Sequence, residues 1–116
     1  MKNAILLFVF NALVLSSPSA KTNEITAEAV VAAIAKEDFT LINTAFDQRL
    51  LSPNEKVNGK PLLIHAIDHD NPEMVRLLIL RGARLDYVDD EGYNPKEYAR
   101  KTQKIYALAE IIVITA

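Results

Sequence analysis

Two histidines stand four residues apart near the middle of this chain and would share one face of a helix. His65 and His69 are separated by one helical turn, with Asp68 beside them. This is a spacing that metal sites use. However, Ala66 directly follows the first histidine, where a zinc hydrolase places a glutamate. We therefore expect both histidines to face solvent or a partner protein. A small metal-binding protein that uses His65 and His69 is the alternative.

An acidic run from Asp86 to Gly92 has the composition of a calcium loop but not its order. An EF-hand loop needs a glycine at its sixth position, and counted from Asp86 that position is Glu91. Tyr87 and Val88 also interrupt the acidic ligands. We expect an exposed turn here, and we predict neither a metal site nor a cofactor.

Nucleophilic side chains are scarce in this chain. It has no cysteine, and beyond residue 20 its single serine is Ser52, which precedes Pro53 and lacks the glycines of a nucleophile elbow. These residues argue against thiol and serine-hydrolase chemistry, so we expect no enzyme. The formal net charge of −2, with both signs interspersed, favours neither nucleic acid nor an anionic membrane as a partner.

The elements that would position these residues repeat along the chain. Gly59 recurs as Gly92 and Ala66 as Ala99, each 33 positions later. A period of this size marks a stack of helical units. Apolar residues at helical spacing predict three helix–turn–helix units separated by polar loops. The helices are expected near residues 26–36, 39–49, 61–67, 72–81, 95–100 and 105–112.

Local signals mark several of the predicted helix ends. Thr26 and Asn71 are expected as N-caps, because their side chains accept from free backbone N–H groups. Pro61 and Pro72 suit the first turn of a helix, and Gly82 suits a left-handed stop. The fold class is therefore all-α. The last helix is predicted to bury a stripe made of Ile105, Leu108, Ile111 and Ile112.

A set of residues in the central unit matches a known pattern. The set comprises Gly59, Leu63, Ala66, Glu73, Val75, Leu77, Leu78, Gly82, Ala83 and Asp86, and it resumes at Asp89, Gly92, Pro95 and Ala99. On these residues the chain resembles the ankyrin repeat family. The family's Thr-Pro-Leu-His start is replaced here by Pro61-Leu62-Leu63-Ile64 and Asn94-Pro95-Lys96-Glu97. The resemblance implies an ankyrin-repeat helix-turn-helix stack, a solenoid of about three repeats, whose terminal repeats are degenerate.

The resemblance also implies where a partner would bind. Ankyrin-like stacks place the turn tips and the first helix of each unit along one concave side. Tyr93 is the best anchor candidate there, because aromatic residues dominate interface energetics. The positions that fall on this side are Lys60, His65, Asp68, His69, Val88, Asp90, Glu91, Tyr93, Lys101 and Thr102.

The N-terminus has the pattern of a secretory signal peptide. Lys2 precedes the apolar run from Ala4 to Leu15, and small residues follow up to Ala20. The run is shorter than the roughly 20 residues that span a membrane as a helix. We expect residues 1–20 to be cleaved and residues 21–116 to form the ankyrin-repeat domain. A retained membrane tether is the alternative.

These features together predict a binding function. We expect an exported protein–protein interaction module, periplasmic or secreted, that is a monomer or part of a hetero-complex. Its partner would be another, unidentified protein, with no nucleic acid and no membrane contact after signal cleavage. The sharper version is an immunity-type inhibitor of a toxin or effector. An accessory protein that stabilises an exported enzyme, a secreted factor that acts on a host protein, and the metal-binding protein are the alternatives.

Overall fold

The computed structural model describes residues 25–116, and over that range the chain is mostly helical. The predicted signal peptide, residues 1–20, lies outside the described residues. In the described range, none of the helices combines the length and the hydrophobicity that crossing a membrane requires.

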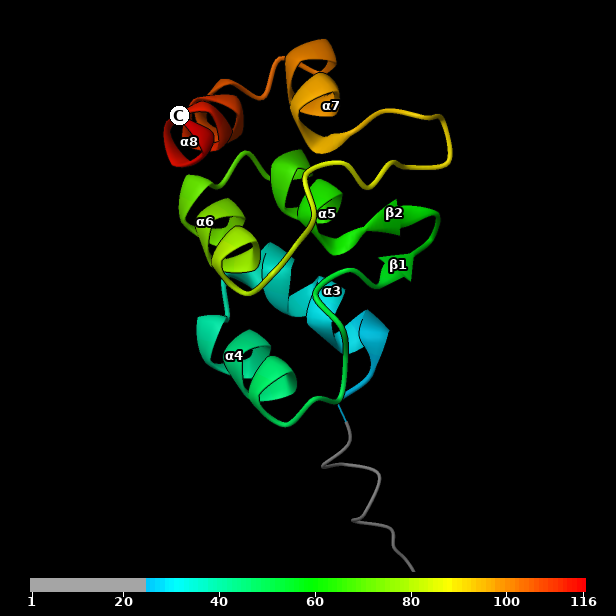
Figure 1. The fold of residues 1–116 in the computed structure, drawn as a ribbon. Coiled ribbons are helices and arrows are strands. Elements are labelled where there is room, and N and C mark those ends of the chain that lie inside the picture. The colour runs from blue at the N-terminus through cyan, green and yellow to red at the C-terminus, as the bar shows by residue number, and fades with distance from the viewer. Residues whose placement is uncertain (1–24) are drawn as a thin grey trace, which may run out of the picture.

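Six helices in residues 25–116 form three helix–turn–helix pairs, and the pairs are stacked on one another (Figure 1). The first helices of the pairs contact one another in series and form one layer, and the second helices lie beside them in another layer. The pairs are α3 (Ala27–Lys36) with α4 (Phe39–Asp47), α5 (Leu62–Asp68) with α6 (Pro72–Leu80), and α7 (Pro95–Lys101) with α8 (Ile105–Thr115).

Backbone features recur at the period seen in the sequence. The second helices begin at Phe39, Pro72 and Ile105, and each start lies 33 residues after the previous one. The turns before these helices also repeat, because each contains one left-handed residue with φ near 50–60°. These residues are Glu37 (φ 60), Asp70 (φ 50) and Gln103 (φ 61).

Short polar side chains explain where several helices begin. Thr26 caps α3 and Asn71 caps α6, each by accepting from backbone N–H groups of the first turn, as predicted. Asn94 and Glu97 form a capping box at the start of α7, which reinforces that start beyond what Pro95 provides. The predicted stop after α6 is also confirmed, since Gly82 has φ 109.

An aliphatic core fills the space between the two helix layers. Its centre is α5, where Leu62, Leu63, Ile64, Ala66 and Ile67 are all at most 1 % exposed. Small residues occupy one column of the first layer, and each of them is buried. This column consists of Ala33, Ala66 and Ala99.

Polar contacts join each helix pair to the next. In the second layer, an arginine of α6 reaches an amide of α4, and another reaches a carboxylate of α8. The contacts are Arg81 Nη2 to Asn43 Oδ1 at 2.7 Å, Arg76 Nε to Glu110 Oε2 at 2.8 Å, and Ala107 N to Asp70 Oδ1 at 2.8 Å.

Two expectations differ from the structure. The polar loop before α5 contains an antiparallel hairpin of β1 (Lys56–Val57) and β2 (Lys60–Pro61), and Pro61 stands at the N-cap position of α5, with no side-chain capping bond, instead of in its first turn. The predicted buried stripe of α8 is rotated, because Ile105 and Ile112 are exposed whereas Ile111 is buried. Those two isoleucines lie on the side that faces away from α6, where the described chain offers no further helix.

Candidate functional site

The candidate site lies where the β1–β2 hairpin, α5, α7 and the loop 81–94 come together. Figure 1 shows the hairpin and this loop projecting on the same side of the helices. A hollow of about 320 Å³ opens between them, and we call it the hairpin hollow. Its lining residues are Asn58, Gly59, Lys60, Asp89, Asp90, Glu91 and Tyr98.

One carboxylate ties three elements together at the edge of the hairpin hollow. Lys60 of β2 donates from Nζ to Asp68 Oδ2 at the end of α5, over 2.8 Å. The Tyr98 hydroxyl of α7 donates to the other oxygen of the same carboxylate. Lys60 Nζ also lies 5.9 Å from the centroid of the Tyr98 ring. We call these three residues the Asp68 cluster.

The contacts within the Asp68 cluster favour the protonated forms of its lysine and tyrosine. The hydrogen bond that Lys60 donates to Asp68 raises the pKa of Lys60. Burial, followed by the hydrogen bond to Asp68, raises the pKa of Tyr98. At neutral pH the cluster therefore holds a lysine cation and a neutral tyrosine hydroxyl. Neither group is prepared to act as a base or a nucleophile, so the cluster is suited to holding a surface in place.

The tip of the loop 81–94 is shaped by a buried carboxylate. Asp89 is buried, and its Oδ1 accepts from the backbone N–H groups of Glu91 at 2.9 Å and Tyr93 at 3.0 Å. The neighbouring Asp90 donates its backbone N–H to the carbonyl oxygen of Gly59, over 3.2 Å. The loop therefore keeps its shape through its own backbone and rests on the hairpin.

A second group of predicted residues lies at the far end of α7. Lys101 Nζ is 5.1 Å from the centroid of the Tyr93 ring, which is half-buried. Thr102 donates its hydroxyl to the Tyr98 carbonyl oxygen at 2.7 Å, so it serves the end of its own helix. Val88 is exposed on the loop. Tyr93 and Lys101 thus present an aromatic ring and a cation together on the surface.

The two histidines are held in different environments. His65 is half-buried, and its Nε2 lies 2.8 Å from the Val57 carbonyl oxygen in β1. It braces the hairpin against α5 and is only partly exposed, whereas the sequence predicted a side chain that faces solvent or a partner. His69 is exposed at the end of α5. Within residues 25–116, no group of three histidine, cysteine, aspartate or glutamate side chains is arranged to hold a metal ion.

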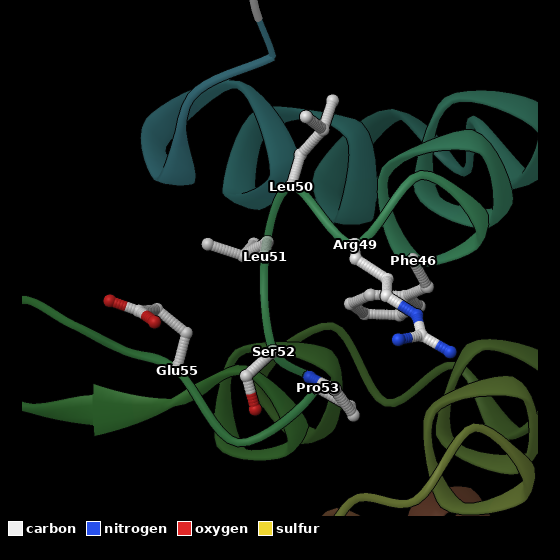
Figure 2. Close-up of a pocket in the computed structure, with 7 residues that line it drawn as sticks. All are labelled: Phe46, Arg49, Leu50, Leu51, Ser52, Pro53 and Glu55. Carbon is white, nitrogen blue, oxygen red and sulfur yellow. The ribbon is translucent and has the colours of Figure 1, made fainter.

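A second hollow, of about 410 Å³, lies after α4 (Figure 2). The Arg49 guanidinium lies beside the ring of Phe46, while the Glu55 carboxylate points away from it. Ser52 Oγ accepts from the backbone N–H of Asn54 at 3.0 Å, so this hydroxyl stabilises a turn. The charged groups of this hollow diverge, and no acid–base pair forms among its lining residues.

Sequence reasoning did not identify Tyr98, although a signal for it was present. Tyr98 stands 33 positions after His65, so it occupies the equivalent place on the next first helix. Extending the exposed-face rule from α5 to α7 would have found it. Asn58, Gly59 and Asp89 were also missed, because their roles depend on how the loop rests on the hairpin.

Comparison with protein-family models, with curated proteins and with solved structures gives no match to this chain. Function is therefore argued from the geometry of the hairpin hollow and its surroundings.

Proposed function

We propose that this chain is a protein–protein interaction module that binds a partner on the face formed by the hairpin, the loop 81–94, α5 and α7. The observation that carries this proposal is the Asp68 cluster. It fixes β2, α5 and α7 to one another through a single carboxylate, and it borders an open hollow. A surface held in this way loses little conformational freedom on binding, which favours affinity.

The architecture supports an ankyrin-type repeat stack as the scaffold for this surface. The helix starts at Phe39, Pro72 and Ile105 keep the 33-residue period, and the turn conformations recur with them. Repeat stacks of this kind bind partners through extended surfaces made by successive units. The hairpin hollow spans the junction of two such units, as a binding surface of that class requires.

The charges around the hairpin hollow indicate the chemistry of the partner. Lys60 is neutralised by Asp68, and Asp90 lies 3.8 Å from Lys56 Nζ, whereas the Glu91 carboxylate is exposed at the rim. The rim therefore favours a partner that presents a lysine or arginine side chain, because complementary charges speed association and select the partner. Tyr93 adds a nearby aromatic contact.

The N-terminal pattern supports export of this module to the periplasm or the exterior. A chain without cysteine needs no oxidative folding step in such a compartment. Affinity purification from the native envelope, followed by mass spectrometry, would identify the partner. The intact mass of the purified chain would report whether residues 1–20 are removed.

The binding face is tested with two variants measured against that partner by calorimetry. We expect Tyr93→Ala to weaken binding by about 1 kcal/mol or more, because an aromatic anchor is removed. Leu80→Ala is the control, since Leu80 is an exposed large apolar side chain on α6, outside this face. Equal affinity for wild type and Tyr93→Ala would place the partner elsewhere.

A further inference from the structure

The last helix pair presents two different surfaces at the open end of the stack. On α7, Lys96 and Arg100 are exposed at the positions where α5 has the buried residues Leu63 and Ile67. Charged residues in place of apolar ones suit a unit whose outer face meets water. On α8, by contrast, several exposed positions are still occupied by apolar residues.

An uncharged apolar stripe runs along the outer side of α8. Ile105 is 60 % exposed, Tyr106 63 %, Ile112 44 % and Val113 70 %, and Ala109 between them is exposed as well. Their spacing of one, four, seven and eight residues places them on one side of the helix. The opposite side is also apolar, with Ala107 and Ile111 buried. A helix that is apolar all round is normally covered on both sides. We call the five exposed residues the α8 stripe.

The preceding helix shows what such a surface is used for. Counting back 33 positions from Ala109 and Ile112 gives Arg76 and Ile79 of α6. Arg76 bonds to Glu110 of α8, and Ile79 packs against the core. Ile79 is therefore partly buried within the stack, whereas the Arg76 side chain stays half exposed while it bonds to α8. On α8 the equivalent Ile112 is exposed, so the stripe includes a position that packs in the preceding pair.

The order of residues in the α8 stripe is symmetric about Ala109. Turning the stripe end for end places Ile105 on Val113 and Tyr106 on Ile112. We propose that the α8 stripe is a homodimer interface in which α8 packs antiparallel to α8 of a second copy, with Ala109 on the two-fold axis. Each large apolar side chain then meets another from the second copy, as an isologous interface requires. The small residue on the axis allows the helices to approach to about 8–10 Å.

The size of the stripe fits a second copy better than an exposed surface. Its large side chains present roughly 400 Å² of apolar area, a scale that marks interaction sites on soluble proteins. Two copies with their polar rims would bury about 1,000 Å², at the small end of specific interfaces. A dimer that dissociates in the micromolar range follows, whereas the sequence predicted a monomer or part of a hetero-complex. α3, the first described helix, lies at the opposite end of the stack (Figure 1).

The orientation of the two helices is also electrostatically favourable. Antiparallel packing brings Lys104, at the start of one α8, near the last turn of the other α8. Cations are stabilising at the C-terminal end of a helix, where carbonyl groups lack partners. The stripe itself carries no charge that would be buried in the contact.

The first test measures mass by sedimentation equilibrium over a range of concentrations, on protein expressed from the full 116-residue sequence. We expect the mass of wild type to rise from one chain to two. Ala109→Glu should remain a single chain, because it places two carboxylates opposite each other on the axis. Leu80→Glu is the matched control, since Leu80 is 71 % exposed on α6, outside the stripe, and this variant should still dimerise. Circular dichroism would verify that both variants are folded.

The second test uses the absence of cysteine to map the pairing directly. Ala109→Cys should form a disulfide-linked dimer under mild oxidation, and so should a mixture of Ile105→Cys with Val113→Cys. Val113→Cys alone should not, because its two copies lie about 12 Å apart along the helix axis, beyond disulfide reach. Ala32→Cys, on exposed α3 surface, is the control. A single-chain mass at every concentration would overturn the proposal, as would a dimer that survives in Ala109→Glu.

Discussion

The helices α5 and α7 occupy equivalent places in successive pairs, yet they are buried to very different degrees. α5 contacts α3 on one side and α7 on the other, whereas the described chain places a neighbouring pair on only one side of α7. Five of the seven residues of α5 are buried, but only Pro95 and Ala99 are buried in α7. The two helices occupy equivalent places in the repeat, so their position in the backbone does not explain the difference. The number of neighbouring helix pairs does, because a side without a neighbour carries charged residues.

What the two helices share is equally instructive. Ala66 and Ala99 lie 33 positions apart, and both are fully buried against the neighbouring layer. Ala66 and Ala99 thus keep both residue type and burial from one pair to the next, whereas the buried Leu63 and Ile67 are replaced by the exposed Lys96 and Arg100.

The largest expected effect comes from truncating the equivalent positions Leu63 and Lys96. Leu63→Ala should lower the free energy of unfolding by about 2–5 kcal/mol, because it leaves a cavity between the layers. Lys96→Ala should change it by no more than about 0.5 kcal/mol, since that side chain is solvated. Urea unfolding followed by circular dichroism measures both. Similar losses in the two variants would break the comparison between α5 and α7.

An intermediate effect is expected at the equivalent positions His65 and Tyr98, which brace different neighbours. Tyr98→Phe removes the hydroxyl that donates to Asp68 and should cost about 0.5–1.5 kcal/mol of stability at neutral pH. Burial and this bond raise the folded-state pKa of Tyr98, so the folded protein favours the protonated phenol. The resulting contribution to stability is present below about pH 10, the ordinary pKa of tyrosine. It is lost as the pH rises through the raised pKa.

Ultraviolet absorbance of the phenolate provides the measurement for Tyr98. In wild type the phenol of Tyr98 should ionise above the usual pH range of tyrosine, because its pKa is raised, and Tyr98→Phe should lack this late transition. Tyr93→Phe is the matched control and should keep the late transition. If the late transition remains in Tyr98→Phe, the Asp68 cluster does not hold this hydroxyl in solution.

The smallest effect is expected in the second layer, where the middle and last pairs are joined by Arg76 and Glu110. The hydrogen bond from Arg76 lowers the pKa of Glu110. A lowered folded-state pKa gives stability that is present above the ordinary value near pH 4.5 and is lost as the pH falls through the lowered value. Glu110→Gln should therefore be slightly less stable than wild type at pH 7. The stability difference between wild type and Glu110→Gln should disappear in acid. Thermal unfolding of both proteins across this pH range measures it. A stability difference that does not change with pH would show that the ion pair does not form.

Much of the fold was predictable because its determinants are local. Thr26, Asn71 and Gly82 act within one turn of their own helices, so residue type alone locates those ends. The hairpin was missed because its strands have two residues each, too few to show an alternating pattern. The rotation of α8 was missed because apolar residues fill nearly every position of that helix and Glu110 is its one charged residue, so its sequence does not indicate which side is buried.

The site was less predictable because it depends on contacts between units. Lys60 and Asp68 were both expected on the binding side, but their ion pair needs β2 to fold against the end of α5. His65 was expected to face solvent, yet the hairpin that covers it was not foreseen. Whether Tyr93 and the acidic rim bind a protein remains a prediction for the experiments above.

The contacts between helix pairs have a consequence for how quickly this chain can fold. The polar links Arg81–Asn43, Asp70–Ala107 and Arg76–Glu110 join residues 38, 37 and 34 positions apart. These links span about one repeat, which avoids the longer loop closures that slow folding. Structure can also grow one pair at a time, since each new pair needs only the one before it. A nascent chain can therefore begin to fold before its last helix is available.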